Sequence, residues 1–142
     1  MSDSAVSRDG CLRRVLLADD HPSVLEQMRD LLLPEFEIVG TAMSGSAMIA
    51  AALQWRPEVI VADVDMPVMD GIEAARQLKR LAYRGAFVFV SMSNDVEIME
   101  AAFSAGADAY ILKIKAGTEL IPAIRAVLQG RKFIPPGAEP GA

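Results

Sequence analysis

Residues 59–71 read VIVADVDMPVMDG, a short apolar run followed by two aspartates and a loop. A continuous apolar run of strand length is typical of a strand that is covered on both faces of a parallel sheet. Asp70 and Glu73 then have the spacing of a capping box at the start of a helix, and Gly71 follows the loop that leaves the strand. This stretch therefore predicts a buried strand, a loop that carries carboxylates, and a helix.

The same alternation extends to both sides of this stretch. Five strand-like apolar runs alternate with five segments in which apolar residues recur at helical spacing, the pattern of a parallel sheet built from βαβ units. The predicted strands are Val15–Ala18, Glu37–Thr41, Val59–Ala62, Ala86–Val90 and Ala109–Leu112. We expect them to be buried central strands. Pro22 suits the first position of the first helix, where its missing N–H has no partner to lose.

Composition limits the class of protein. A chain of 142 residues is long enough for one domain with a buried core, and no apolar run approaches the roughly 20 residues that span a bilayer. The formal net charge is −5 and the Lys and Arg residues are scattered, so no nucleic-acid-binding surface is predicted. Cys11 is the single cysteine and cannot form an internal disulfide, and the chain opens without a signal-peptide pattern. We therefore expect a cytoplasmic protein without membrane contact.

The two ends of the chain differ in composition from its middle. Residues 1–12 are polar and small, which predicts a flexible N-terminal segment. Residues 134–142 are rich in Pro and Gly, which predicts a C-terminal tail or a truncated linker. A single domain over residues 13–133 is expected between them.

Carboxylates follow two of the predicted strands. Asp19 and Asp20 come after the first strand, and Asp63 and Asp65 come after the third. Ligands of open parallel α/β sheets bind outside the carboxyl ends of the strands, and clustered carboxylates repel one another unless a cation lies among them. An oxygen-only ligand set favours Mg²⁺. For any one of these residues, a simple turn or helix-capping role is the alternative.

Polar residues also end the fourth and fifth strands. Ser91 follows the fourth strand and Lys113 follows the fifth. A hydroxyl and an ammonium that face the same pocket as the carboxylates suit a group with developing negative charge, such as a phosphoryl group.

Four ordered motifs between Arg13 and Phe133 resemble those of response-regulator receiver domains. They are LLADDHP at 16–22 (the acidic pair), DVDMPVMDG at 63–71 (the phosphoacceptor loop), FVSMS at 89–93 (the hydroxyl strand) and GADAYILK at 106–113 (the lysine strand). The resemblance implies a single-domain flavodoxin-like, doubly wound α/β fold with a five-stranded parallel sheet. It also implies the strand order 2-1-3-4-5, with helices on both faces.

The resemblance further implies a signalling switch rather than an enzyme. Asp63 would accept a phosphoryl group from a sensor histidine kinase or a histidine phosphotransfer protein, because it precedes the Met-Pro pair at the family's spacing. Asp20, and less directly Asp19, would hold Mg²⁺ together with Asp63 and the backbone carbonyl of Asp65, with Mn²⁺ as an alternative ion. Lys113 would pair with the phosphoryl oxygens.

The resemblance also implies how the signal is transmitted. Ser91 would hydrogen-bond the phosphoryl group, Tyr110 would rotate inward into the space that Ser91 leaves, and Asp65 and Ser93 would tune the lifetime of the phosphate. The changed conformation would control transcription or a partner protein, with a homodimer as a further assembly that the family allows.

The sequence also departs from the family's pattern. Ile114 stands where many receivers have proline, so we expect a trans bond after Lys113. Pro122 falls in the fifth helical segment, so that helix should begin near Thr118 or be kinked near its start. DDHP at 19–22 and AIRAVLQG at 123–130 are most similar to receivers of the LuxR or NarL type. His21 is expected to be a surface residue at a helix entrance.

Two other functions remain as alternatives. Asp63-Val64-Asp65 also resembles the nucleophile motif of haloacid-dehalogenase-type phosphatases, but there the motif usually belongs to the first strand and continues with Gly-Thr, whereas here it ends the third strand and continues with Met66-Pro67. A phosphorylation-independent, receiver-like binding module is the second alternative, although such modules commonly lose an acidic residue or the lysine. This chain keeps both the acidic residues and the lysine.

Overall fold

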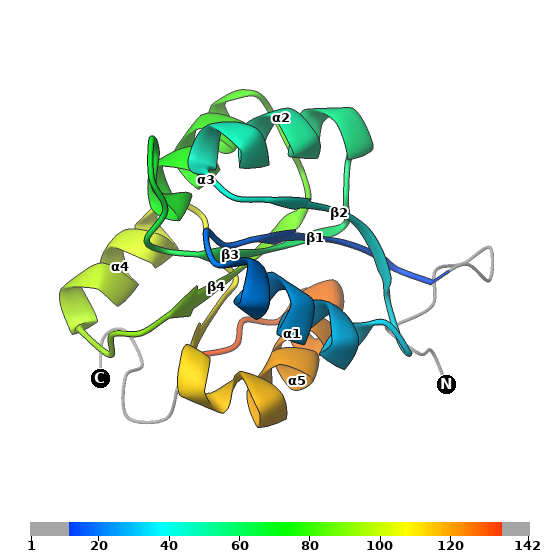
Figure 1. Cartoon of the computed structure of the whole chain (residues 1–142). Coiled ribbons are helices and arrows are strands. Elements are labelled where there is room, and N and C mark those ends of the chain that lie inside the picture. Colours follow the sequence, from blue (N-terminus) through cyan, green and yellow to red (C-terminus); the bar gives the residue numbers. More distant parts are fainter. Residues whose placement is uncertain (1–11, 135–142) are drawn as a thin grey trace.

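Five parallel strands pair in the order β2-β1-β3-β4-β5 in the computed structural model, which describes residues 12–134 (Figure 1). The strands are β1 (Arg14–Ala18), β2 (Glu37–Ala42), β3 (Val59–Asp63), β4 (Ala86–Ser91) and β5 (Ala109–Leu112). The helices are α1 (Pro22–Leu32), α2 (Gly45–Trp55), α3 (Gly71–Arg80), α4 (Val96–Ser104) and α5 (Ala116–Leu128), with a 3₁₀ helix, η1 (Lys113–Lys115), before α5. The predicted fold and strand order are confirmed.

Helices cover both faces of the sheet. Side chains from α1 and α5 pack with alternate residues of the strands in one apolar cluster, and side chains from α2, α3 and α4 pack on the opposite face in a second cluster. Figure 1 shows α1 and α5 on one side of the sheet and α2 and α3 on the other. All five residues of β3 are buried, because β3 has a strand on either side and a helical layer on each face.

The strand β2 differs from the expectation of a buried central strand, which is wrong for this segment. Glu37 and Thr41 are exposed, and only Ala42 is buried. The reason is position: β2 is at the edge of the sheet and pairs with β1 alone. Four of the predicted strand ranges are also one residue too short, so Asp63 and Ser91 are the last residues of β3 and β4.

Helix starts follow the local signals in the sequence. Pro22 is the first residue of α1, as predicted, and Asp70 caps α3 by accepting the N–H of Glu73 at 2.8 Å. The helix α5 begins at Ala116, two residues before Thr118, and it contains Pro122. Thr118 and Pro122 are both exposed, so the carbonyl that loses its donor can be hydrated. Residues 12–134 contain no cis peptide bond, as expected after Lys113.

After α5 the chain returns to the sheet. Phe133 forms a parallel bridge with Ala109, on the side of β5 that has no neighbouring strand. The predicted flexible segment 1–12 and tail 134–142 lie outside the described residues, except for Leu12 and Ile134. Within the described part of the chain, every helix is too short or too polar to cross a membrane.

Gly71 is required where α3 meets the end of β3. A Cβ atom at this position would lie 2.3 Å from the carbonyl oxygen of Asp63 and 3.2 Å from the ring of Phe89. We expect Gly71→Ala to lower the free energy of unfolding by about 2 kcal/mol in urea denaturation, since backbone on both sides must shift. Gly117→Ala is the matched control: a Cβ there meets no atom within 4 Å. It should raise stability by up to about 1 kcal/mol in α5. Equal stabilities of the two variants would contradict this packing.

Candidate functional site

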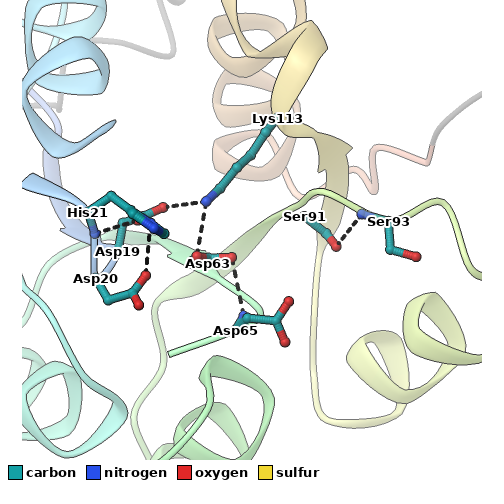
Figure 2. A network of polar contacts seen from close by, with 8 residues as sticks. All are labelled: Asp19, Asp20, His21, Asp63, Asp65, Ser91, Ser93 and Lys113. Atoms are coloured by element: carbon teal, nitrogen blue, oxygen red, sulfur yellow. Dashed lines mark hydrogen bonds and ion pairs between the residues drawn. The ribbon is translucent and has the colours of Figure 1, made fainter. Parts of the chain in front are cut away.

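Three charged side chains meet at the carboxyl edge of the sheet. Asp63 ends β3, Asp19 follows β1, and Lys113 follows β5 in η1 (Figure 2). Because β1 and β3 are parallel neighbours, their carboxyl ends lie side by side, at the position where the strand order reverses. The sequence predicted this meeting of residues.

One ammonium group forms ion pairs with two buried carboxylates. The Nζ atom of Lys113 lies 3.0 Å from Oδ2 of Asp63 and 3.0 Å from Oδ2 of Asp19. Asp19 is fully buried, Asp63 is 3 % exposed, and the Lys113 side chain is 14 % exposed. With all three groups ionised, the trio carries one uncompensated negative charge.

The electrostatics of the trio follow from burial and charge. Burial raises the pKa of Asp63 and the negative charge of Asp19 raises it further, while the hydrogen bond from Lys113 lowers it without cancelling the rise. Burial alone would lower the pKa of Lys113, but its contacts with Asp19 and Asp63 outweigh burial and raise the pKa. Lys113 is therefore held as the ammonium form, and the site as a whole still favours a further positive charge.

His21 and Asp20 extend the cluster. The His21 backbone N–H donates to Oδ1 of Asp19 at 2.9 Å, and its ring Nδ1 lies 3.1 Å from that oxygen and 3.0 Å from Oδ1 of Asp20. The His21 side chain is 61 % exposed, as expected for a surface residue, but its ring also contacts both aspartates. Sequence reasoning missed this contact, and the adjacency of the three residues is the signal that could have found it.

The donor set fits a hard divalent cation. One ligand atom from each of Asp19, Asp20, His21 and Asp63 lies within 4.8 Å of the others. Oδ2 of Asp19 and Oδ1 of Asp20 are both buried; the Lys113 ammonium lies 3.0 Å from the first and the His21 ring nitrogen lies 3.0 Å from the second. Carboxylate oxygens are the ligands that Mg²⁺ and Mn²⁺ prefer, usually one or two of them together with water.

The loop after Asp63 is tightly folded. The Asp65 N–H donates to Oδ1 of Asp63 at 3.2 Å, while the Asp65 side chain is exposed. Val68 has a φ of 70°, a conformation that β-branched residues rarely adopt, and the N–H of Met69 donates to the carbonyl of Pro67 at 2.7 Å. The first residue of α2, Gly45, donates its N–H to the carbonyl of Met69 at 2.8 Å, so the start of α2 fixes this loop.

A second polar group lies on β4 and β5. Ser91 is buried, and its Oγ accepts the N–H of Ser93 at 3.0 Å (Figure 2). Tyr110 is fully buried, its hydroxyl donates to the carbonyl of Ser93 at 2.9 Å, and burial raises its pKa. Among the described residues no hydrogen bond joins Ser91 to Asp63 or Lys113. The full burial of Tyr110 shows that its ring lies inward.

Comparison with known proteins identifies a family. The family model of the response regulator receiver domain matches residues 15–125. The nitrate/nitrite response regulator protein NarL of Escherichia coli is 32 % identical over 122 residues, which cover 84 % of this chain and 56 % of NarL. The transcriptional regulatory protein PrrA of Mycobacterium tuberculosis is 35 % identical over 119 residues, 83 % of this chain and 51 % of PrrA. The chain thus spans about half the length of these curated relatives.

Solved structures agree with this comparison. A LuxR-family two-component response regulator from Aurantimonas has a TM-score of 0.83 and 31 % identity, and the match covers 88 % of this chain and 91 % of that one. The isolated receiver domain of RcsB from Salmonella enterica, determined with the phosphomimetic BeF₃⁻, has a TM-score of 0.80 and 29 % identity. That match covers 89 % of this chain and 95 % of the RcsB chain.

The charge imbalance predicts that Asp63→Asn stabilises the protein. The pKa of Asp63 is raised in the folded state, so ionised Asp63 costs stability above that pKa and costs nothing below the pKa of the unfolded chain. In metal-free buffer at pH 7 we expect urea denaturation to show a gain of about 1 kcal/mol for Asp63→Asn, and the gain should shrink towards pH 4. Asp70→Asn, which removes a charge but keeps a good helix cap, should change little. A loss of stability in Asp63→Asn at pH 7 would contradict the imbalance.

Proposed function

The chain belongs to the response regulator receiver domain family, and on that premise we propose that Asp63 accepts a phosphoryl group from a sensor histidine kinase or a histidine phosphotransfer protein. The observation that carries the proposal is the position of Asp63, a nearly buried carboxylate at the end of β3 whose Oδ2 lies 3.0 Å from the Lys113 ammonium. The domain then acts as a phosphorylation-dependent signalling switch rather than as an enzyme with its own small-molecule substrate.

The transfer step requires positioning and charge more than proton transfer. An ionised Asp63 oxygen attacks phosphorus, the bond from phosphorus to the donor's imidazole nitrogen breaks, and the bonding electron pair leaves with the imidazole. The ionised carboxylate of Asp63 carries no proton, so the attack needs no base. Lys113 is placed to neutralise charge that spreads over the phosphoryl oxygens in the loose transition state.

The acidic cluster supplies the metal ligands in this proposal. Asp20 and Asp63, less directly Asp19, and the backbone carbonyl of Asp65 would hold Mg²⁺, with Mn²⁺ as an alternative. A bound divalent ion supplies charge neutralisation at the phosphoryl oxygens. The close grouping of carboxylate oxygens from Asp19, Asp20 and Asp63 supports this assignment.

The second polar group is proposed to respond to the product. Ser91 donates its hydroxyl to a phosphoryl oxygen on Asp63, and Tyr110 adjusts with it, since both residues are linked through Ser93. The exposed Asp65 carboxylate and the neighbouring Ser93 are proposed to tune the lifetime of the aspartyl phosphate by influencing the approach of water.

The output is proposed to be control of transcription or of a partner protein in the cytoplasm, without nucleic-acid or membrane binding by this domain itself. NarL and PrrA are regulators about twice as long as the matched region. RcsB, of which one structure contains two dimers bound to two parallel DNAs, shares 29 % identity with this chain. The RcsB dimers support a homodimer as one assembly of this domain.

The central test is the intact mass after incubation with acetyl phosphate and Mg²⁺. The wild-type chain should gain one phosphoryl group, and chelation of the metal with EDTA should suppress the gain. Asp63→Asn should gain none. Asp65→Asn is the matched control, since Asp65 is an exposed aspartate two residues away, and it should still be phosphorylated.

Two results would refute the assignment. One is phosphorylation of Asp63→Asn together with its loss in Asp65→Asn. The other is catalytic turnover of nitrophenyl phosphate, which would favour a haloacid-dehalogenase-type phosphatase over a switch that takes its phosphoryl group from phosphohistidine or small acyl phosphates.

A further inference from the structure

The chain after α5 is attached to the edge of the sheet at three residues, Lys132–Ile134, here called the C-terminal strap. The N–H of Phe133 donates to the carbonyl of Asp108 at 2.9 Å, and the N–H of Tyr110 donates to the carbonyl of Phe133 at 3.1 Å. These two bonds give β5 a pairing partner on its otherwise unpaired edge.

Side chains of the strap contact both faces of the sheet. Nζ of Lys132 donates to the carbonyl of Ala107 at 3.2 Å and lies 5.9 Å from the centre of the Phe103 ring. Phe133 packs against the apolar cluster of α1 and α5, whereas Ile134 packs against the opposite cluster, which contains Tyr110. Lys132, which also lies 3.7 Å from Oδ1 of Asp108, is exposed and the other two residues are only partly buried, so the strap buries little surface and can open locally.

Tyr110 joins the strap to the loop between β4 and α4. Its backbone N–H bonds Phe133, and its hydroxyl bonds the carbonyl of Ser93. The N–H of Ser93 in turn donates to the hydroxyl oxygen of Ser91. A continuous series of hydrogen bonds therefore runs from Ser91 through Ser93 and Tyr110 to Phe133.

We propose that this series carries the switch to the C-terminal strap, and that engagement of Ser91 by the phosphoryl group loosens the strap from β5. The proposal rests on the proposed function of Asp63. When the Ser91 hydroxyl turns towards the phosphoryl oxygens, the Ser93 N–H loses its acceptor and the loop moves. The Tyr110 hydroxyl follows the carbonyl of Ser93, and the shifted ring disturbs the packing of Ile134. The conformational change thereby reaches Ile134, the last residue of the strap.

Tyr83 provides an internal comparison. It is buried like Tyr110, and its hydroxyl also donates to a backbone carbonyl, that of Pro57 at 2.6 Å. It lies in the segment that enters β4, at the opposite end of the strand from Ser91, and it has no hydrogen bond to the strap. Substitution of either tyrosine by phenylalanine removes a hydrogen bond to a backbone carbonyl, but only Tyr110 belongs to the series.

The experiment measures amide exchange of Phe133 with water by NMR in the whole 142-residue chain, with and without beryllofluoride and Mg²⁺. In the wild type, beryllofluoride should accelerate this exchange about tenfold, because the strap opens more often. Tyr83→Phe should show the same acceleration. In Tyr110→Phe the acceleration should fall to less than about twofold, because the bond to Ser93 is absent.

The readouts separate this proposal from the function of Asp63. Shifts of the Val64 and Asp65 amides report beryllofluoride at Asp63. If these two amides shift while Phe133 exchange stays constant, or if Tyr110→Phe shows the full acceleration, the coupling to the strap is refuted and the proposed function stands.

If the Val64 and Asp65 amides do not shift, the proposed function fails, and Ser91→Ala then tests the coupling without any ligand. This variant also removes the acceptor of the Ser93 N–H, so several-fold faster Phe133 exchange is expected, whereas exposed Ser104→Ala should leave the rate unchanged. Equal rates in the two serine variants would refute it.

Discussion

The ammonium of Lys113 lies between two buried carboxylates, and the chemistry of the domain depends on this shortage of positive charge. Asp19 and Asp63 are both within 3.0 Å of the same nitrogen. A buried charge that lacks full compensation lowers the stability of the fold. Here the packing of the strands between two apolar clusters offsets that loss. This imbalance is the electrostatic basis of the proposed binding of a divalent cation and a phosphoryl group.

The topology explains why these groups meet. A parallel sheet places the ends of β1, β3, β4 and β5 at one edge, and the reversal of strand order between β1 and β3 leaves that edge open. Tight backbone contacts then fix the loops: α3 starts against the carbonyl of Asp63 at Gly71, and α2 starts against Met69 at Gly45. The apolar layers hold the sheet, and the strand ends and loops carry the polar groups of the site.

The sequence predicted the frame and the charged trio because each depends on local signals. Apolar runs predicted the strands, and Asp63 and Lys113 follow from strand ends. The exposure of β2 was not predicted, because edge position is a property of pairing and not of composition. The contact of the His21 ring with two aspartates depends on a side-chain direction, and the pairing of Phe133 with β5 joins residues that are distant in sequence. The adjacency of His21 to the two aspartates does not fix the direction of its ring, and the pairing of Phe133 has no local signature.

The measurement that tests the central claim most directly is a pH titration of the Asp63 carboxyl carbon by NMR, with and without Mg²⁺. Without metal, the pKa of Asp63 should lie above the ordinary value of an aspartate, because burial and Asp19 outweigh the single ammonium of Lys113. Saturating Mg²⁺ should bring the pKa below that value, since the added cation favours the ionised form. A metal-free pKa at or below the ordinary value, or one that Mg²⁺ leaves unchanged, would contradict the account.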